Sequence, residues 1–253
     1  MKLDICLVHG LFGHLRAPEI KNAFGQEAVV SAPDLLGYGA FMKAATDGLS
    51  LRDQAEHVIS QIQANHGNSV HLVGHSVGGA VAMLVAHSKP DLVRSVISVE
   101  GNFTLKDAFW SSEIAKKADY EVEEIVSGYQ KDPDAWMNAA IPNPTDLSAR
   151  LAKEWLDNQP ASTIKAQAAA VVAATGDKSY LETVRSIMAS RIPVHLIAGA
   201  HSASGWDTPD WANQLCTSRI NLPNAGHLMM VEDPKRFAQA VLSGIALSQD
   251  LRE

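Results

Sequence analysis

The sequence lacks the features that mark several classes of protein. Its 253 residues include only two cysteines, Cys6 and Cys216, so a disulfide-stapled scaffold is excluded, and no Cys/His spacing suggests a metal site. No block of lysine and arginine occurs and the formal net charge is −7, so we expect no nucleic-acid partner. No stretch approaches the roughly 18 apolar residues that a transmembrane helix requires, so we expect no membrane span.

The two cysteines and the first residues of the chain indicate the compartment. Cys6 lies within a strand-like pattern and Cys216 near the end of a helical pattern, so both are predicted to be buried, reduced thiols. Residues 1–4 lead directly into that strand, and the apolar run at 5–8 is far too short for the hydrophobic region of a signal peptide. We therefore predict a cytoplasmic protein.

What is present is an ordinary globular composition, with 46% apolar and 19% charged residues, enough for one large α/β domain or two small ones. Short apolar runs predict six strands, at 3–8, 29–32, 70–73, 93–99, 193–198 and 218–222. Helices are predicted at 51–64, 77–87, 209–215 and 233–247. Ser50, in a capping box with Asp53, and Thr208 are predicted N-caps. This alternation indicates a parallel sheet covered on both faces.

The stretch from 103 to 190 departs from this alternation. It contains no convincing strand, holds a large share of the aromatic residues and is typical of several helices. Helix breaks are predicted at Gly128, 132–133, 142–144, Pro160 and 176–177. We predict an inserted helical cap, which divides the chain into a first part of the core at 1–102, the cap at 103–190 and a second part of the core at 191–253.

The residues Gly74-His75-Ser76-Val77-Gly78 give the strongest chemical signal. A β-branched apolar run precedes them and an Ala-rich helical segment follows, which is the strand–turn–helix context in which G-x-S-x-G exposes a nucleophilic serine. Gly74 and Gly78 suit a turn so tight that a Cβ would collide with the neighbouring strand or helix. The alternative is a glycine-rich turn with a chance serine, but the context favours Ser76 as the nucleophile.

Together with this turn, three further motifs resemble the α/β-hydrolase superfamily. They are His9-Gly10 after the first strand, the turn at 34–39 (Asp-Leu-Leu-Gly-Tyr-Gly), and Gly226-His227 before the last helix. Their order and spacing match the family along nearly the whole chain. The resemblance implies the α/β-hydrolase fold, with a mostly parallel sheet and a variable helical cap. The family usually has a β-hairpin before the His-Gly strand, which here begins at residue 3, so we expect a core of six strands rather than eight.

The resemblance also implies roles for individual residues. His227 matches the family's general base, the alternative being a surface-loop histidine. The backbone N–H groups of Leu11 and Val77 match the oxyanion hole, the alternative for His9-Gly10 being a plain strand exit. His75 is also expected to pack beside the nucleophile, and plain cap packing is the alternative for the aromatic residues of the cap. The residues expected to line the substrate pocket are Phe12, His75, Phe103, Trp110, Trp136 and Leu228.

The acid of the expected triad is where the sequence departs from the family. The usual Asp after the penultimate strand is absent from the segment at 199–202 (Gly-Ala-His-Ser). Glu100 ends the strand after the nucleophile helix, where some dehalogenases, epoxide hydrolases and lactonases of the family carry their acid, and burying an unpaired carboxylate is costly. Asp207 is the alternative, although it also resembles a helix start. We predict Glu100, with the role of orienting His227 and stabilising its imidazolium.

These residues predict a serine hydrolase that cleaves an ester or lactone of a small, largely apolar substrate through an acyl-enzyme, without a cofactor. Other serine-triad members of the fold cleave amides or carbon–carbon bonds, and both activities stay open as alternatives. A binding protein without turnover is a further alternative, because the usual Asp is missing. A nucleophilic Asp in place of Ser76 would have indicated a dehalogenase or an epoxide hydrolase. The sequence leaves the substrate and the oligomeric state open.

Overall fold

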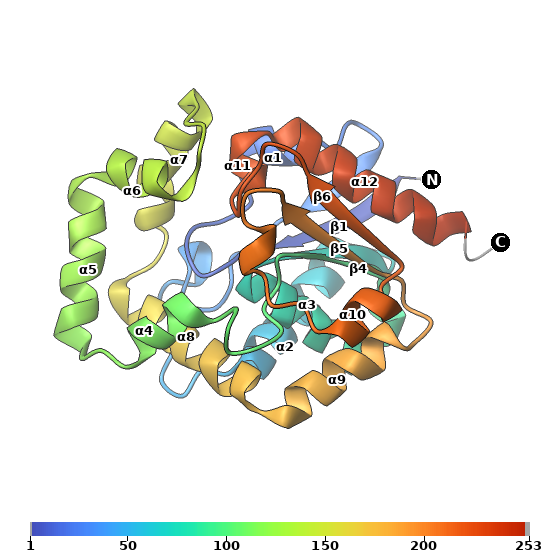
Figure 1. Ribbon diagram of the computed structural model, residues 1–253, viewed down its shortest axis with the longest axis horizontal. Coiled ribbons are helices and arrows are strands. Elements are labelled where there is room, and N and C mark those ends of the chain that lie inside the picture. Colours follow the sequence, from blue (N-terminus) through green and yellow to red (C-terminus); the bar gives the residue numbers. More distant parts are fainter. Residues whose placement is uncertain (1, 251–253) are drawn as a thin grey trace.

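Parallel strands form the centre of the molecule, in a computed structural model that describes residues 2–250 (Figure 1). They are β1 (Leu3–Val8), β2 (Ala28–Ser31), β3 (Val70–His75), β4 (Val93–Val99), β5 (Val194–Gly199) and β6 (Ser218–Leu222). Their order across the six-stranded sheet is β2-β1-β3-β4-β5-β6, and every neighbouring pair is parallel. The predicted six-stranded parallel sheet is confirmed, and β1, β4 and β6 have the predicted bounds.

The parallel register brings the carboxyl ends of the central strands to one edge of the sheet. Val8 at the end of β1 pairs with Gly74 of β3, which pairs in turn with Ser98 of β4. Val99 at the end of β4 pairs with Ile197 of β5. Ligand sites of open parallel sheets lie beyond the carboxyl ends of the strands. The residues that follow β1, β3 and β4 are therefore the ones that this topology gathers into a site.

Helices cover both faces of the sheet. Those of the core are α1 (Pro18–Asn22), α2 (Leu51–Asn65), α3 (Val77–Ser88), α10 (Asp210–Leu215), α11 (Met229–Glu232) and α12 (Pro234–Asp250), with short 3-10 turns at Gly39–Phe41, Pro90–Leu92 and Ala203–Gly205. Successive side chains of a strand point to opposite faces. On β3, Leu72 packs in the apolar cluster that includes α2 and α3, whereas Val73 packs in the cluster that includes α1 and α12. Both faces are thus buried, as predicted.

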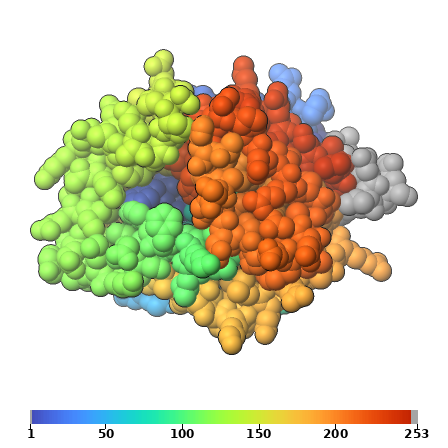
Figure 2. All heavy atoms as spheres, in the orientation of Figure 1, coloured from blue at the N-terminus to red at the C-terminus, as the bar shows by residue number. Residues whose placement is uncertain are grey.

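The chain between β4 and β5 is helical. Its helices are α4 (Phe109–Ala115), α5 (Asp119–Lys131), α6 (Pro133–Ala140), α7 (Asp146–Leu156), α8 (Ala161–Gly176) and α9 (Lys178–Met188). Figure 1 shows α5, α6 and α7 as a layer beside the core, and Figure 2 shows a hollow between this layer and the core, with the dark blue N-terminal segment at its base. Helix α9 packs against the core helices α3 and α10. The division of the chain at 102 and 190 stays a prediction.

Several local predictions can be compared with the structure. Ser50 caps α2 in a capping box, because its Oγ accepts from the Asp53 N–H at 3.2 Å and its own N–H donates to Asp53 Oδ2 at 2.8 Å. Thr208 is not an N-cap, since α10 begins at Asp210 after Pro209. Two further predictions, a helix break at Gly128 and burial of Cys216, are wrong: Gly128 lies inside α5, and Cys216 is partly exposed, unlike Cys6. Within residues 2–250, no helix combines the length and apolarity needed to cross a bilayer.

Candidate active site

Ser76 lies at a sharp turn between β3 and α3. Its φ is +54° and its ψ is −123°, a conformation that side chains disfavour. A Cβ on Gly74 would stand 2.2 Å from the Gly78 carbonyl oxygen, and one on Gly78 would stand 2.3 Å from that of Val8, so neither position tolerates a side chain. Ser76 is partly exposed, whereas 70–75 and 77–86 are buried. The turn therefore presents one hydroxyl at the carboxyl edge of the sheet.

Two backbone donors lie beside this serine. Val77 is the first residue of α3, whose N–H groups point back toward the turn. Gly10 precedes Leu11 and lies against Ser76, because a Cβ on Gly10 would stand 3.1 Å from Ser76 Cβ. Within residues 2–250, neither the Leu11 N–H nor the Val77 N–H donates to a protein acceptor. Both predicted oxyanion donors are thus available for a ligand oxygen.

The loop that carries Leu11 is fixed by contacts with distant segments. The Gly13 N–H donates to Gln159 Oε1 at 3.1 Å, and its carbonyl accepts from Asn158 Nδ2 at 2.9 Å. Gly13 has a φ of +76°, and a Cβ there would overlap the Trp155 ring at 2.2 Å. The Tyr38 hydroxyl donates to the Leu11 carbonyl at 2.8 Å. The segment at the end of α7 and the turn at 34–39 together hold this loop in place beside Ser76.

His9 supports the same loop as a neutral imidazole. Its Nε2 accepts from the Leu35 N–H at 3.1 Å, and its Nδ1 donates to the Gly10 carbonyl at 2.8 Å. An imidazole that accepts at one nitrogen is not protonated there. Burial lowers the pKa of His9 to about 4, against an ordinary value of 6.5. His9 is therefore a neutral structural link between β1 and the turn at 34–39.

Buried neutral histidines predict a loss of stability on acidification. Burial lowers the pKa values of His9 and His195 from 6.5 to about 4. The unfolded chain takes up these protons near pH 6.5 and the folded chain only near pH 4, so stability falls as the pH falls through this window. We expect the free energy of unfolding in urea to be lower at pH 5 than at pH 7 by about 2 kcal/mol for each such histidine.

A variant tests the origin of this pH dependence. The His195 imidazole is bonded to Ser218 Oγ at 2.8 Å and to Ser248 Oγ at 2.7 Å, and glutamine preserves polar groups at this place. His195→Gln should reduce the difference between pH 5 and pH 7 by about 2 kcal/mol. An equal difference in wild type and variant would contradict the assignment to His195.

His227 and Glu100 are joined directly. His227 Nδ1 lies 2.6 Å from Glu100 Oε2, and 42% of the His227 side chain but only 4% of the Glu100 side chain is exposed. Glu100 has a φ of +44°, directly after β4. Its other oxygen, Oε1, accepts from the Gly199 N–H at 2.8 Å and from Ser202 Oγ at 2.5 Å. Sequence reasoning missed Ser202, which lies in the segment where the family's Asp is absent.

The pKa of Glu100 reflects two opposing effects. Burial alone would raise it, but the hydrogen bonds and charge of His227, with the donors of Ser202 and Gly199, outweigh burial and hold the pKa below its ordinary value. Glu100 is therefore a carboxylate at neutral pH. Such an acceptor at Nδ1 fixes a hydrogen on that nitrogen and leaves Nε2 of His227 with a free lone pair.

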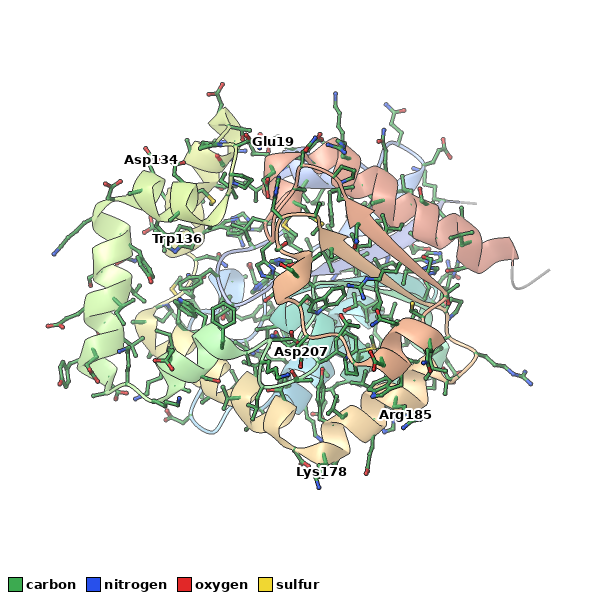
Figure 3. The ribbon with its side chains drawn as sticks, in the orientation of Figure 1. Glu19, Asp134, Trp136, Lys178, Arg185 and Asp207 are labelled. Atoms are coloured by element: carbon green, nitrogen blue, oxygen red, sulfur yellow. The ribbon has the colours of Figure 1, made fainter. Side chains whose placement is uncertain are left out.

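Asp207, the alternative acid, is bonded elsewhere. Its Oδ2 accepts from the Thr104 hydroxyl at 2.6 Å, and its Oδ1 lies 3.5 Å from Lys106 Nζ. Its backbone N–H donates to Asp107 Oδ1 at 2.6 Å. These contacts join the loop after β5 to the start of the helical segment between β4 and β5. Figure 3 shows Asp207 beside that segment. The structure brings Glu100, not Asp207, to His227.

His75 contacts His227 through both its ring and a hydrogen bond. Its Nε2 donates to the His227 carbonyl at 2.9 Å, and the two rings lie 4.5 Å apart between centroids. Burial, followed by the charge of His227, holds the pKa of His75 well below its ordinary value. Since His75 directly precedes Ser76, this contact links the turn of Ser76 to the loop of His227. His75 is buried, which matches the expectation that it packs beside the nucleophile.

Aromatic residues of the helical segment converge on Phe12. The Phe12 ring centroid lies 5.1 Å from that of Trp110 on α4, 5.4 Å from that of Trp136 on α6 and 6.3 Å from that of Tyr129 on α5. All four rings are partly exposed, and Figure 3 shows Trp136 on the inner side of α6. Tyr129 was missed in the sequence because nothing local separates it from a surface tyrosine.

Two other predicted pocket residues are buried. Phe103 is 2% exposed and packs against Trp206 and Trp211, at 5.9 and 6.3 Å between ring centroids. Its side chain is covered by the core, and its place in the substrate pocket stays a prediction. Leu228 is 8% exposed and belongs to the cluster that includes α12, beside the loop of His227. Among residues 2–250, no group of three His, Cys, Asp or Glu side chains is placed to hold a metal ion.

The sequence matches the profile of the alpha/beta hydrolase family over residues 7–240. The chain belongs to this family. Similar curated proteins include the lipase LipV of Mycobacterium tuberculosis (strain ATCC 25618 / H37Rv), 33% identical over 51% of this chain and 44% of that protein. A triacylglycerol lipase of Pseudomonas fragi is 34% identical over 40% of this chain and 34% of that protein. The matches thus span less than half the length of either relative.

Solved structures resemble this chain over nearly its whole length. A hydrolase from Pseudomonas aeruginosa has a TM-score of 0.71 at 22% identity, covering 96% of this chain and 90% of that one. An esterase from Thermogutta terrifontis has a TM-score of 0.67 at 17% identity, covering 98% and 91%. At such identities the likeness shows the fold alone, and it agrees with the parallel sheet and covering helices described above.

Proposed function

We propose that this hydrolase cleaves a carboxylic ester or lactone of a small, largely apolar molecule through an acyl-enzyme. The observation that carries the proposal is the hydrogen bond from His227 to the buried carboxylate of Glu100, close to the turn that carries the partly exposed Ser76. A serine hydroxyl is a weak nucleophile until a positioned base takes its proton. The names of the lipase relatives agree with this reaction class.

The proposed reaction begins with attack of Ser76 Oγ on the substrate carbonyl. His227 Nε2 accepts the hydroxyl proton, and Glu100 stabilises the imidazolium through Nδ1 without taking that proton. The Leu11 and Val77 N–H groups stabilise the negative charge that develops on the carbonyl oxygen. His227 then returns the proton to the leaving alkoxide. A water molecule, deprotonated by His227, attacks the acyl-enzyme, the bond to Ser76 Oγ breaks, and His227 returns the proton to Oγ as the acid is released.

The part of the substrate that carries the acyl or alkyl group is proposed to lie against the aromatic cluster of Phe12, Trp110, Tyr129 and Trp136. Phe12 directly follows Leu11, so this cluster begins beside the proposed oxyanion donor. Aromatic rings offer a large apolar area that gains free energy when water leaves it. An apolar group next to the ester carbonyl therefore suits the partly exposed rings around Phe12.

Replacement of Trp136 tests this placement. Trp136→Ala is expected to raise KM for p-nitrophenyl hexanoate about tenfold, because about 1.4 kcal/mol of apolar contact is lost, with little change for p-nitrophenyl acetate. Tyr120→Ala is the matched control, since Tyr120 is 68% exposed on α5. Equal effects of Trp136→Ala on both esters would argue against an acyl group at this cluster.

A substrate panel tests the reaction class. Purified enzyme is expected to hydrolyse p-nitrophenyl acetate and an aliphatic lactone at least about 100-fold faster than p-nitroacetanilide, because an amide nitrogen leaves only when a general acid protonates it, whereas a phenolate or alkoxide leaves more readily than an amide anion. Faster cleavage of the anilide would support amide hydrolysis as the activity. Cleavage of a β-diketone alone would support hydrolysis of a carbon–carbon bond. No turnover of any member would support the binding-protein alternative.

A further inference from the structure

The loop that carries His227 is anchored by a glutamate outside the proposed triad. The chain passes from β6 through Asn224, whose φ is +57°, to Gly226 and His227, and α11 follows at once. The Gly226 N–H donates to Glu232 Oε1 at 2.8 Å. A carboxylate at the end of α11 thus reaches back to the residue immediately before His227.

The backbone that carries Glu232 is firmly held. Met229, Met230 and Val231 are all 0% exposed and lie in the apolar cluster that includes α12. The Glu232 N–H donates to the Leu228 carbonyl at 3.2 Å. Because buried apolar side chains fix α11 in the core, the Glu232 carboxylate offers Gly226 an acceptor at a fixed position.

Stability alone does not account for a glutamate at this place. Glu232 Oε2 is buried and has no hydrogen-bond partner within residues 2–250. Burial raises the pKa of Glu232, and the nearby charge of Glu100 raises it further, against the Gly226 N–H and His201, which lower it. An unpaired buried oxygen beside a second carboxylate destabilises the folded state. The one hydrogen bond that the Glu232 side chain makes within residues 2–250 is the one it accepts from the Gly226 N–H.

Separate contacts hold His227 and the peptide that joins Ala225 to Gly226. The His227 carbonyl accepts from His75 Nε2 at 2.9 Å, and its ring donates to Glu100 at 2.6 Å. The Ala225 carbonyl accepts from the His201 N–H at 3.0 Å, and the N–H of the same peptide donates to Glu232. On the opposite side of the turn, the Gly226 carbonyl approaches Gly199 so closely that a Cβ on Gly199 would stand 2.4 Å from it. Only the Glu232 carboxylate holds the Gly226 N–H, within the hydrogen bonds of residues 2–250.

We propose that Glu232 is a positioning residue for His227. By fixing the N–H of the peptide that joins Ala225 to Gly226, one residue before His227, it places the imidazole so that Nδ1 bonds Glu100 and Nε2 is directed to Ser76. The catalytic meaning of this role rests on the proposed function, whereas the positioning itself is a property of the structure. A misplacement of a catalytic group by about 1 Å can cost about 100-fold in rate.

Steady-state kinetics with p-nitrophenyl acetate test the proposal. Glu232→Ala is expected to lower kcat about 10- to 100-fold with KM within about threefold, because binding groups are untouched and the base is displaced. Glu232→Gln, whose amide oxygen can accept from Gly226, should recover at least about tenfold of that loss. Glu56→Ala is the matched control, because Glu56 is an exposed glutamate on α2.

Proton NMR supplies a readout that does not depend on activity. The hydrogen shared by His227 and Glu100 should give a downfield imidazole resonance in wild type, in Glu232→Gln and in Ser76→Ala, and this signal should broaden or vanish in Glu232→Ala. If Ser76→Ala retained full activity, the proposed function would fail, yet the resonance would still decide whether Glu232 positions the ring. The two failures are therefore distinguishable.

Two results would overturn the proposal. The first is Glu232→Ala with kcat within twofold of wild type and an unchanged His227 resonance. The second is Glu232→Gln as impaired as Glu232→Ala, which would assign the effect to charge rather than to the bond with Gly226. If Glu232→Ala does not fold, Glu232→Met replaces it, because methionine fills the same space without a hydrogen-bond acceptor for Gly226. The same loss of kcat and of the His227 resonance is expected for Glu232→Met.

Discussion

Ser76→Ala is expected to lower kcat/KM for p-nitrophenyl acetate by at least about 10⁴-fold. Alanine removes the only atom of this residue that can form the acyl-enzyme, while the neighbouring donors and His227 stay in place. The strained turn is expected to persist, because it depends on Gly74 and Gly78, where a Cβ would stand 2.2 and 2.3 Å from backbone oxygens. Thermal unfolding of the variant should therefore match wild type.

Ser88→Ala is the matched control for this substitution, since Ser88 is an exposed serine at the other end of α3. It should keep kcat/KM within about twofold of wild type, in line with the small effects of most surface substitutions. A Ser76→Ala enzyme that hydrolyses the ester at the wild-type rate would end the acyl-enzyme account. Residual activity at the level of non-specific hydrolysis, with a folded protein, is the result that the account predicts.

Glu100→Gln is expected to lower kcat by about 10³- to 10⁴-fold, and the reason lies in the partners of its two oxygens. The Gly199 N–H can only donate, and it contacts Oε1 at 2.8 Å. The glutamine oxygen must therefore take that position, which turns the amide NH₂ toward His227. Nδ1 of His227 then accepts, its hydrogen moves to Nε2, and the ring can no longer take the proton of Ser76.

Asp207→Asn separates the two candidate acids. Asp207 accepts from Thr104 at 2.6 Å, and an asparagine oxygen can do the same, so kcat is expected to stay within about threefold of wild type. Steady-state kinetics on both variants, with circular dichroism to confirm folding, give the comparison. If Asp207→Asn lost activity while Glu100→Gln retained it, the assignment of the acid to Glu100 would be wrong.

The sequence predicted the sheet well because buried parallel strands leave a simple pattern. β1 and β4 begin and end where their apolar runs do, since both faces of the sheet are covered there. β6, at the edge of the sheet, also has its predicted bounds, although its polar residues alternate with apolar ones. The turn at 74–78 could also be predicted from neighbouring residues, because Gly74, Ser76 and Gly78 lie within one short segment. Glu100 was predictable as a carboxylate at the end of a buried strand, where a partner is needed.

Contacts between distant segments could not be predicted in this way. Ser202 was noticed only as part of a segment without Asp, and nothing in the sequence indicates that its hydroxyl bonds Glu100. Thr208 resembled a cap, but the chain enters α10 through Pro209, and the Thr208 hydroxyl is buried without a partner among the described residues. Phe103 is buried by distant segments whereas Trp110 is partly exposed, and the apolar pattern of the sequence does not reveal this difference.

Labelling with a fluorophosphonate, followed by mass spectrometry of the digested protein, tests the central claim most directly. Such a reagent phosphonylates a serine only when a neighbouring base and an oxyanion site activate it. We expect one adduct, on the peptide that contains Ser76, formed rapidly in wild type and at least about 100-fold more slowly in Glu100→Gln. An unlabelled Ser76 in folded wild-type protein, or an adduct on another serine, would contradict it.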